Sequence, residues 1–329
     1  MDPSIQALLG ALTVEIDALM RQDLANIDNP LLHQVIDYAL FKGGKRLRPA
    51  LTVLSHDLCR SDKAPDQRRL HTVALCFEYT HTASLLHDDV IDWASQRRGC
   101  KSANKIWGNT NVILAGDFLH ARALFLAATH GGIECLEIIS KAVEAMVRAE
   151  YLQLENTASQ NLSDTFYYQV LQGKTAMLIS AACETGCIVA TASREQRQAA
   201  RTFGTSLGLA FQIVDDALDY AGDPDKTGKA IGNDWREQRM TLPLILTLDR
   251  VNAVDRAWLL AQFAAPRAVR ARAFVEVAGL IEQAGGVSQA LARARQLIDE
   301  AIAALAVFPD SEAKDTLIAL SRYVLQRES

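Results

Sequence analysis

The stretch that decides the fold runs from His81 to Arg98 and reads His-Thr-Ala-Ser-Leu-Leu-His-Asp-Asp-Val-Ile-Asp-Trp-Ala-Ser-Gln-Arg-Arg. Asp88 and Asp92 are four residues apart, so a helix places both carboxylates on one face. Like charges at this spacing repel each other by roughly a few tenths of a kcal/mol, so the pair gains nothing as structure alone. A divalent cation reverses the sign of that interaction. Mg²⁺ suits such a pair, because it usually takes one or two carboxylates together with phosphate oxygens of a substrate.

A second acidic cluster, in Phe211–Tyr220, repeats this pattern. It contains Asp215, Asp216 and Asp219, and again the first and last carboxylates share one helical face between apolar flanks. A single cluster of this kind is more often a solvated helix end. Two copies in one chain predict two helices that face each other across a cavity, with metal ions and a diphosphate between them.

The composition bounds the class of protein. The chain has 329 residues, of which 49% are hydrophobic, so it can bury a large core. Its formal net charge of −5 argues against a surface for nucleic acid, and we expect no nucleic-acid partner. Basic residues nevertheless gather at Lys42–Arg48 and at Arg97–Arg98. Local basic clusters in an acidic protein favour a small anionic ligand.

The cysteines and the apolar segments indicate the compartment. The cysteines form no Cys-x-x-Cys motif and no ordered spacing with histidine, which argues against zinc and indicates free thiols. The N-terminal residues are amphipathic, unlike a secretory signal. The most membrane-like segment is Thr175–Ser193, but Glu184 interrupts it, so we expect a buried core helix there and no transmembrane segment. We therefore expect a cytoplasmic protein.

Hydrophobic periodicity predicts the fold class. Most prolines fall where helices should begin or end, and between them apolar residues recur at spacings of three and four. No region alternates strictly enough for a sheet. We predict an all-α protein, a bundle of about a dozen helices around a central cavity. Because the composition shows no break along the chain, we expect one domain over residues 1–329. The tail from about Ala253 to Gln326 reads as three amphipathic helices that serve packing and dimerisation.

Two glycine-containing stretches are candidate anion sites. In Gly43–Pro49 two glycines free the backbone, and Lys45 and Arg48 can close on phosphate oxygens. The alternative is a basic turn between helices. Gly173-Lys174-Thr175 is predicted to open the apolar helix, where Lys174 is a plausible anion contact, although helix capping explains it equally well.

These motifs together resemble the trans-isoprenyl diphosphate synthases of the polyprenyl synthetase family. The tail Leu320–Arg327 also resembles that of the long-chain members, the octaprenyl and decaprenyl diphosphate synthases. The matching pieces stand in the family's order and cover about Gly43 to Leu246: Gly43–Pro49, His81–Asp92 with Arg97-Arg98-Gly99, Gly116-Asp117-Phe118-Leu119, Glu150-Tyr151-Leu152-Gln153, Lys174-Thr175-Ala176, Phe211–Asp219, Gly228-Lys229 and Thr241-Leu242-Pro243-Leu244.

The resemblance implies the all-α isoprenoid synthase fold, a homodimer and a set of site residues. The metal is Mg²⁺, with ligands Asp88, Asp92 and Asp215, and Asp219 completes the second cluster. The allylic diphosphate, farnesyl or geranyl, meets Arg97, Lys174 and Lys229. Isopentenyl diphosphate meets Lys45, Arg48, His81 and Arg98. Thr175, Gln212 and Arg239 are further substrate-binding positions, and the residues that carry catalysis are Asp88, Asp92, Asp215 and Lys174.

The implied reaction is the head-to-tail condensation of isopentenyl diphosphate with the allylic diphosphate. Metals stabilise the leaving diphosphate. The allylic C–O bond ionises, the double bond of isopentenyl diphosphate attacks the cation, and a proton is lost. A dry apolar cavity protects the cation from water.

The chain departs from the family pattern in two places, which together involve three residues. The family has Gly-Lys where this chain has Gln238-Arg239, so the positive charge remains but the flexible glycine is lost, which puts the contact of Arg239 in doubt. Cys100 stands at a position that is often Lys.

The residues beneath Asp88 bear on product length. Ser84, Ala83 and Thr80 are small or modest, whereas bulky aromatics there stop growth early in this family, so a farnesyl product is not expected. The first large residue is Phe77, which a helical rise of 1.5 Å per residue places roughly 16 Å below Asp88. If Phe77 faces the cavity, the product is geranylgeranyl diphosphate (C20). If it turns aside, a long-chain product of C40–C50 for quinone side chains follows, which the tail favours.

Three other classes of protein share some of these features, and each is distinguished by a feature of the sequence. A terpene cyclase or head-to-head synthase also has paired acidic motifs but lacks the Gly-Gly-Lys-Arg-Leu-Arg-Pro stretch. A non-catalytic subunit that sets product length in a heteromer loses acidic residues, whereas this chain keeps both clusters. A structural diphosphate-binding protein needs no second metal cluster.

Overall fold

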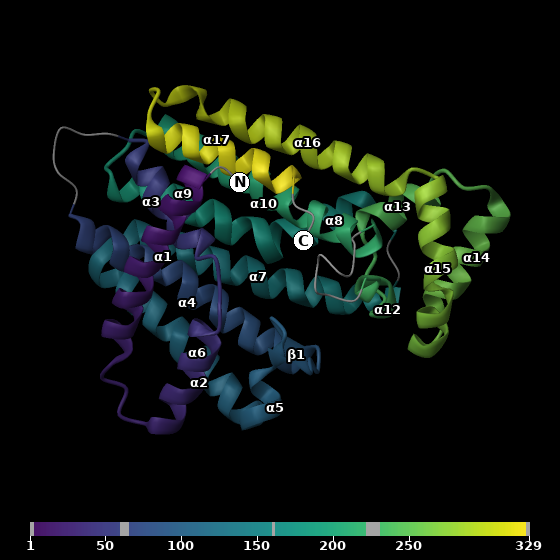
Figure 1. The fold of residues 1–329 in the computed structure, drawn as a ribbon, viewed down its shortest axis with the longest axis horizontal. Coiled ribbons are helices and arrows are strands. Elements are labelled where there is room, and N and C mark those ends of the chain that lie inside the picture. Colours follow the sequence, from purple (N-terminus) through teal and green to yellow (C-terminus); the bar gives the residue numbers. More distant parts are fainter. Residues whose placement is uncertain (1–2, 60–65, 160–161, 222–230, 327–329) are drawn as a thin grey trace. The chain divides into compact units, whose positions relative to one another are not determined.

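The structure of the protein, a computed structural model, describes residues 3–59, 66–159, 162–221 and 231–326. Over these residues the chain is helical almost throughout, which confirms the all-α prediction (Figure 1). The exception is a hairpin of two short strands, β1 (Gln96–Arg97) and β2 (Cys100–Lys101). The sequence analysis missed this hairpin, because two-residue strands are too short to show an alternating pattern.

The chain forms two compact units that are interleaved along the sequence. The first comprises Met1–Glu144, Leu178–Gly204 and Leu305–Ala319, and the second comprises Ala145–Met177, Thr205–Ala304 and Leu320–Ser329. Four helices, α7 (Ile133–Ser159), α9 (Met177–Val189), α10 (Arg194–Ala221) and α17 (Glu312–Leu325), contribute residues to both units.

In the first unit a long helix carries the first acidic cluster. This helix, α4 (Gln67–Ile91), packs against α6 (Asn109–Leu126), α3 (Leu47–Asp57) and α1 (Pro3–Leu24). It begins at Gln67, where the side chain of Asp66 accepts a hydrogen bond from the backbone N–H of Arg69 at 3.0 Å and caps the helix. Asn29 caps α2 (Pro30–Phe41) in the same way. The first unit also contains α5 (Ala103–Trp107), the π-helical η1 (Ala127–Gly131) and the 3-10 turn η3 (Leu305–Val307).

One apolar helix agrees with the prediction, and a second apolar segment was not predicted to be membrane-like. Residues Leu178–Cys187 of α9 are all buried, which confirms the predicted core helix. Among the described residues, the one run long and apolar enough to span a membrane is instead Asn109–Gly131, formed by α6 and η1. Of its apolar 18-residue segment, 39% is buried, and length and composition alone are weak evidence for a membrane span.

Within the described ranges, seven elements lie wholly in the second unit, two from the middle of the chain and five from its C-terminal part. They are α8 (Asp164–Leu171), the π-helical η2 (Gln172–Ala176), α12 (Asn233–Arg236), α13 (Leu242–Leu248), α14 (Ala253–Ala264), α15 (Arg267–Gln283) and α16 (Gly286–Ala304). The tail from Ala253 is therefore four helices, α14 to α17, and the prediction of three is wrong. Pro266 separates α14 from α15, and Gly285, with φ +73°, separates α15 from α16.

Candidate active site

The first acidic cluster lies at the C-terminal end of α4. Asp88 is half-buried and Asp92 is exposed at the C-cap, where its backbone N–H donates to the carbonyl of Asp88 at 2.8 Å. In the part of the chain that the structure describes, no three His, Cys, Asp or Glu side chains are grouped as a metal site. A hard cation that completes its shell with phosphate oxygens does not need three protein ligands. The carboxylate oxygens at Asp88 and Asp92 are therefore a suitable donor set for Mg²⁺.

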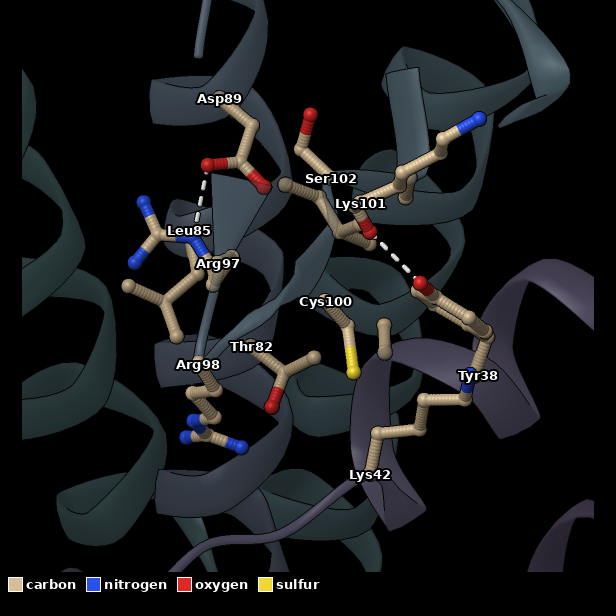
Figure 2. A pocket seen from close by; sticks show the side chains of 13 residues that line it. Tyr38, Lys42, Thr82, Leu85, Asp89, Arg97, Arg98, Cys100, Lys101 and Ser102 are labelled. Atoms are coloured by element: carbon tan, nitrogen blue, oxygen red, sulfur yellow. Dashed lines mark hydrogen bonds and ion pairs between the residues drawn. The ribbon is translucent and has the colours of Figure 1, made fainter. Parts of the chain in front are cut away.

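The hairpin after α4 presents the two predicted arginines. Arg97 pairs with Cys100 across the hairpin, and Arg98 and Gly99 form its turn with φ values of 51° and 74°. Both residues of this turn have the positive φ that a two-residue hairpin requires. Arg97 donates from Nε to Asp89 at 2.6 Å (Figure 2). Arg98 donates to the carbonyl of Gly43. The hairpin therefore places Arg97 beside the acidic cluster and Arg98 beside the glycine loop.

The glycine loop meets the hairpin closely. Gly43 and Gly44 have φ values of 99° and 150°, which favour glycine. A Cβ at Gly44 would lie 2.9 Å from Nη1 of Arg46 and 3.3 Å from Nη1 of Arg98. The glycines thus give the loop its conformation and leave room for two guanidinium groups, while Lys45 is exposed.

Positive charge concentrates around His81. Burial lowers the pKa of His81 well below its usual value, and the nearby guanidinium groups of Arg48, Arg98, Arg97 and Arg46 lower it further. Burial also lowers the pKa of Arg48 to about 10; the carboxylate of Glu78 opposes this shift and the guanidinium of Arg98 adds to it. Nε of Arg48 is buried and has no hydrogen-bond partner among the described residues. A buried donor that makes no hydrogen bond costs free energy, and so do like charges placed close together. A bound anion would relieve both costs, so this cluster suits an anion.

Arg46, in the same loop, has a different task. It is 3% exposed and donates to Glu78 at 2.6 Å, to Asp17 at 2.7 Å and to the carbonyl of Leu40 at 2.6 Å. Its backbone φ is 45°, which a residue other than glycine adopts at a cost. Arg46 therefore anchors the loop to α1, α2 and α4. No feature of the sequence separates it from Arg48.

The residues of α4 that are predicted to set product length precede the first acidic cluster in the chain. Phe77, Thr80 and Ala83 are buried, and Ser84 donates to the carbonyl of His81 at 2.8 Å. Nearby, Nε2 of His87 is 3.1 Å from the carbonyl oxygen of Ile113 on α6. This contact is possible because residue 116 is glycine, where a Cβ would lie 2.3 Å from the imidazole of His87.

In the second unit Lys174 is held by α7. Its Nζ donates to Glu150 at 2.7 Å and to Gln153 at 3.1 Å. The close approach depends on Gly173, where a Cβ would lie 2.7 Å from Cβ of Ala149. Gly173 and Lys174 lie in the π-helical turn η2 and not at the start of a helix, so that part of the prediction is wrong. A π-turn at this point re-aims the side chain, as such turns often do at functional sites.

The middle carboxylate of the second cluster belongs to a buried hydrogen-bond chain. Thr175 donates to Gln212 at 3.3 Å, Gln212 donates to Asp216 at 2.9 Å, and Tyr167 donates to Asp216 at 2.6 Å. Burial raises the pKa of Asp216 to about 7. Thr175 and Gln212 are thus joined, as residues of one site should be. The sequence analysis missed Tyr167, which lies outside every recognised motif.

The other carboxylates of this cluster lie around α12. Asp215 is half-buried. Asp219 accepts from the backbone N–H of Asn233 at 3.1 Å and of Asp234 at 2.8 Å. A carboxylate has about four acceptor positions, so these bonds leave Asp219 able to hold a metal as well. Burial, together with Asp216 and Asp219, raises the pKa of Asp234 well above its usual value. Asp234 is a fourth carboxylate of this site, which the sequence analysis did not include.

Arg239 and Lys229 complete the predicted set. Arg239 pairs with Glu237 at 3.0 Å and lies 3.7 Å from Asp234, so its charge is directed toward the second acidic cluster. Lys229 lies outside the described residues, and its substrate contact stays a prediction.

Replacing Gln238 by glycine should stabilise the protein. Gln238 has a φ of 61°, the conformation for which the family uses glycine. Relief of this backbone strain, less the entropy cost of glycine, should raise the free energy of unfolding by about 0.5–1 kcal/mol. Urea denaturation measures this change. Glu237→Gly, at the neighbouring position, should destabilise instead, and a destabilised Gln238→Gly would contradict the prediction.

The chain matches a known protein family over most of its length. The sequence pattern described as polyprenyl synthetase matches residues 29–275, and the chain belongs to that family. It is 34% identical to the octaprenyl diphosphate synthase of Escherichia coli (strain K12) over 95% of this chain and 98% of the relative.

Two solved structures share the fold over nearly the whole chain. A decaprenyl diphosphate synthase from Rhodobacter capsulatus superimposes with a TM-score of 0.88 at 34% identity, over 99% of both chains. A polyprenyl synthase from Caulobacter crescentus CB15, complexed with calcium and isoprenyl diphosphate, gives a TM-score of 0.88 at 34% identity, over 99% of this chain and 97% of that one. The predicted all-α fold and the predicted family are both confirmed.

Proposed function

We propose that this protein is an all-trans polyprenyl diphosphate synthase that condenses isopentenyl diphosphate head-to-tail with an allylic diphosphate, farnesyl or geranyl. The observation that carries the proposal is the cationic cluster of the first unit. There, the buried Nε of Arg48 has no hydrogen-bond partner within the part of the chain that the structure describes. Arg48 lies near Arg98 and near His81, whose pKa is lowered well below its usual value. Family membership supports the same activity.

Each group of residues has a distinct task in this reaction. Lys45, Arg48, His81 and Arg98 bind the diphosphate of isopentenyl diphosphate, and a neutral His81 acts as a hydrogen-bond donor. Arg97, Lys174 and Lys229 bind the allylic diphosphate, and the contacts of Lys174 with Glu150 and Gln153 leave its third N–H for that ligand.

The acidic clusters supply the metal sites of the proposal. Asp88 and Asp92, and Asp215 with Asp219, would hold Mg²⁺, which as a Lewis acid stabilises negative charge on a departing diphosphate. The related synthase that contains calcium and isoprenyl diphosphate supports a divalent metal. Thr175 and Gln212 line the site near the allylic carbon, and Asp216 with Tyr167 fixes the orientation of Gln212.

A product assay tests the proposal. The purified chain is incubated with Mg²⁺, radiolabelled isopentenyl diphosphate and farnesyl diphosphate, and the dephosphorylated alcohols are resolved by length. We expect elongation that EDTA abolishes and that excess Mg²⁺ restores. A folded protein that makes no elongated alcohol would refute the proposed function and revive the cyclase and partner-subunit readings.

We propose a long-chain product of C40–C50. The names of the octaprenyl and decaprenyl relatives support this length. The sequence of α4 supports it as well, because the residues five and four positions before Asp88 are the small Ala83 and Ser84. The alternative, a C20 product, requires that Phe77 close the cavity.

Phe77→Ala separates these lengths. If the product is long-chain, Phe77 is not the floor, and the variant should give the same C40–C50 alcohols as the unchanged chain. Phe308→Ala is the control, because it removes an equally buried ring of the first unit far along the chain from α4. A C20 product that lengthens only in Phe77→Ala would establish the geranylgeranyl alternative.

We propose further that the enzyme is a cytoplasmic homodimer, with one synthetase domain over residues 1–329. An apolar stripe of α6, formed by Leu114, Phe118, Ala121 and Phe125, is exposed or half-buried, with Leu114 57% and Phe125 54% exposed. Exposed apolar stripes of this kind mark protein or membrane contacts. A second copy of the chain covers the stripe in this proposal, which also accounts for the apolar run Asn109–Gly131.

Leu114→Asp should convert the dimer into a monomer. A carboxylate in an apolar interface must lose its water without a partner, which weakens association by several kcal/mol. Light scattering after gel filtration measures the mass at micromolar concentration. Val275→Asp on α15, where the valine is 82% exposed, should leave the mass unchanged. A monomeric unchanged chain, or a dimeric Leu114→Asp, would refute this interface.

A further inference from the structure

The middle aspartate of the first cluster differs from its two neighbours. Asp88 is half-buried and Asp92 is exposed, whereas Asp89 is only 2% exposed. Successive helical residues are rotated by about 100°, so Asp89 lies off the face that Asp88 and Asp92 share. Its carboxylate is directed toward the hairpin, where Oδ1 accepts from Nε of Arg97 at 2.6 Å (Figure 2).

This contact sets the direction of the Arg97 guanidinium. The hydrogen bond between Asp89 and Arg97 uses Nε and neither of the two terminal nitrogens of the guanidinium (Figure 2). Those nitrogens are the edge of the guanidinium that can bind a phosphate group in a bidentate manner. Arg97 is 36% exposed, so this edge can be reached by a ligand.

The backbone of the hairpin has separate anchors. The carbonyl oxygen of Asp89 accepts from Nδ2 of Asn104 at 2.9 Å and from the backbone N–H of Ala94 at 3.0 Å. Ser102 donates to the carbonyl of Ala94 at 2.6 Å. Because these bonds do not use the Asp89 side chain, a substitution at Asp89 leaves the hairpin attached and changes the direction of Arg97.

We infer, on the basis of the proposed function, that Asp89 is a positioning residue that directs Arg97 at the allylic diphosphate and is not a metal ligand. It acts through Arg97 alone. The carboxylate holds one nitrogen of the guanidinium, and the freed edge binds the substrate without first losing side-chain freedom.

A double-mutant cycle tests this inference. The chains are the unchanged protein, Asp89→Ala, Arg97→Ala and the double variant, each assayed for kcat, for both KM values and for the Mg²⁺ concentration at half-maximal rate. Asp89→Ala should raise the KM for the allylic diphosphate about tenfold, the size expected for loss of a charge-assisted contact, with kcat nearly unchanged. In the Arg97→Ala background it should add less than about twofold, because coupled residues are not additive.

Other variants and readouts exclude a merely structural role. Asp89→Asn keeps an acceptor oxygen for Nε and should recover part of the loss. Glu134→Ala, which removes an exposed partner of Arg197 in the same unit, should change none of the constants. The KM for isopentenyl diphosphate and the Mg²⁺ requirement should stay constant in Asp89→Ala.

Two results would overturn the inference while the proposed function stands. They are a raised Mg²⁺ requirement in Asp89→Ala, as for a metal ligand, and effects of Asp89→Ala and Arg97→Ala that multiply in the double variant. If the unchanged protein does not elongate any allylic diphosphate, the proposed function is wrong and the inference falls with it.

Discussion

Replacing Asp88 by alanine should lower kcat/KM by at least about a thousand-fold. Metal stabilisation of a leaving diphosphate is worth several kcal/mol, and each 1.4 kcal/mol is a factor of ten in rate. Asp88 shares its helical face with Asp92, so its loss removes half of the predicted ligand pair on α4. The assay is the elongation of farnesyl diphosphate at saturating Mg²⁺.

The same substitution should not harm the fold. Removing one of two like charges on a helical face relieves a repulsion of roughly a few tenths of a kcal/mol. Asp88→Ala should remain folded, and thermal unfolding measured beside the unchanged chain checks this. Glu137→Gln removes an exposed carboxylate of α7 and should leave activity intact. Activity of Asp88→Ala within tenfold of the unchanged chain would exclude Asp88 as an essential metal ligand.

Replacing Gly186 by alanine should lower the free energy of unfolding by about 2–3 kcal/mol, the usual cost of forcing extra atoms into a packed core. A Cβ at this position would lie 2.2 Å from the backbone oxygen of Thr52 and 2.9 Å from the backbone N of His56. The obstacle is the backbone of α3, which cannot rotate away as a flexible side chain can. The two helices must separate, and packing along the buried face of α9 is lost.

Gly10 provides the matched control. It also lies within a helix, α1, but a Cβ there would have no other atom within 4 Å. Gly10→Ala should therefore stabilise the protein by about 0.5–1 kcal/mol through helix propensity alone. Guanidinium denaturation of both variants measures the two changes. Equal effects of the two substitutions would show that α3 and α9 are not in close contact.

The two acidic clusters divide their carboxylates in the same way. In each, the middle aspartate is buried against a protein donor, Arg97 for Asp89 and Tyr167 for Asp216. The first and last aspartates remain half-buried or exposed. The shared pattern supports one task for the outer pair, metal binding, and another for the middle residue, the orientation of its neighbours.

Local sequence was enough to predict the all-α fold and the helical face that carries the first acidic cluster. The starts of α2 and α4 depend on residues next to them in the sequence, because Asn29 and Asp66 cap the helices through local hydrogen bonds. The pairing of Asp88 with Asp92 on one face follows from helical geometry alone. Such features depend on neighbours within a few positions, and a sequence displays those directly.

Only the tertiary structure decided what each charged side chain does. Arg46 and Arg48 are two residues apart in one basic loop, yet Arg46 is neutralised by Asp17 and Glu78 while Nε of Arg48 is left for a ligand. Likewise, Lys174 lies in a π-turn and donates to Glu150. Asp89 accepts from Arg97, a residue of the hairpin that the hydrophobic periodicity did not predict. Their partners are distant in sequence, and burial sets the cost of leaving a charge unpaired, so the task of each residue emerges only when the chain has folded.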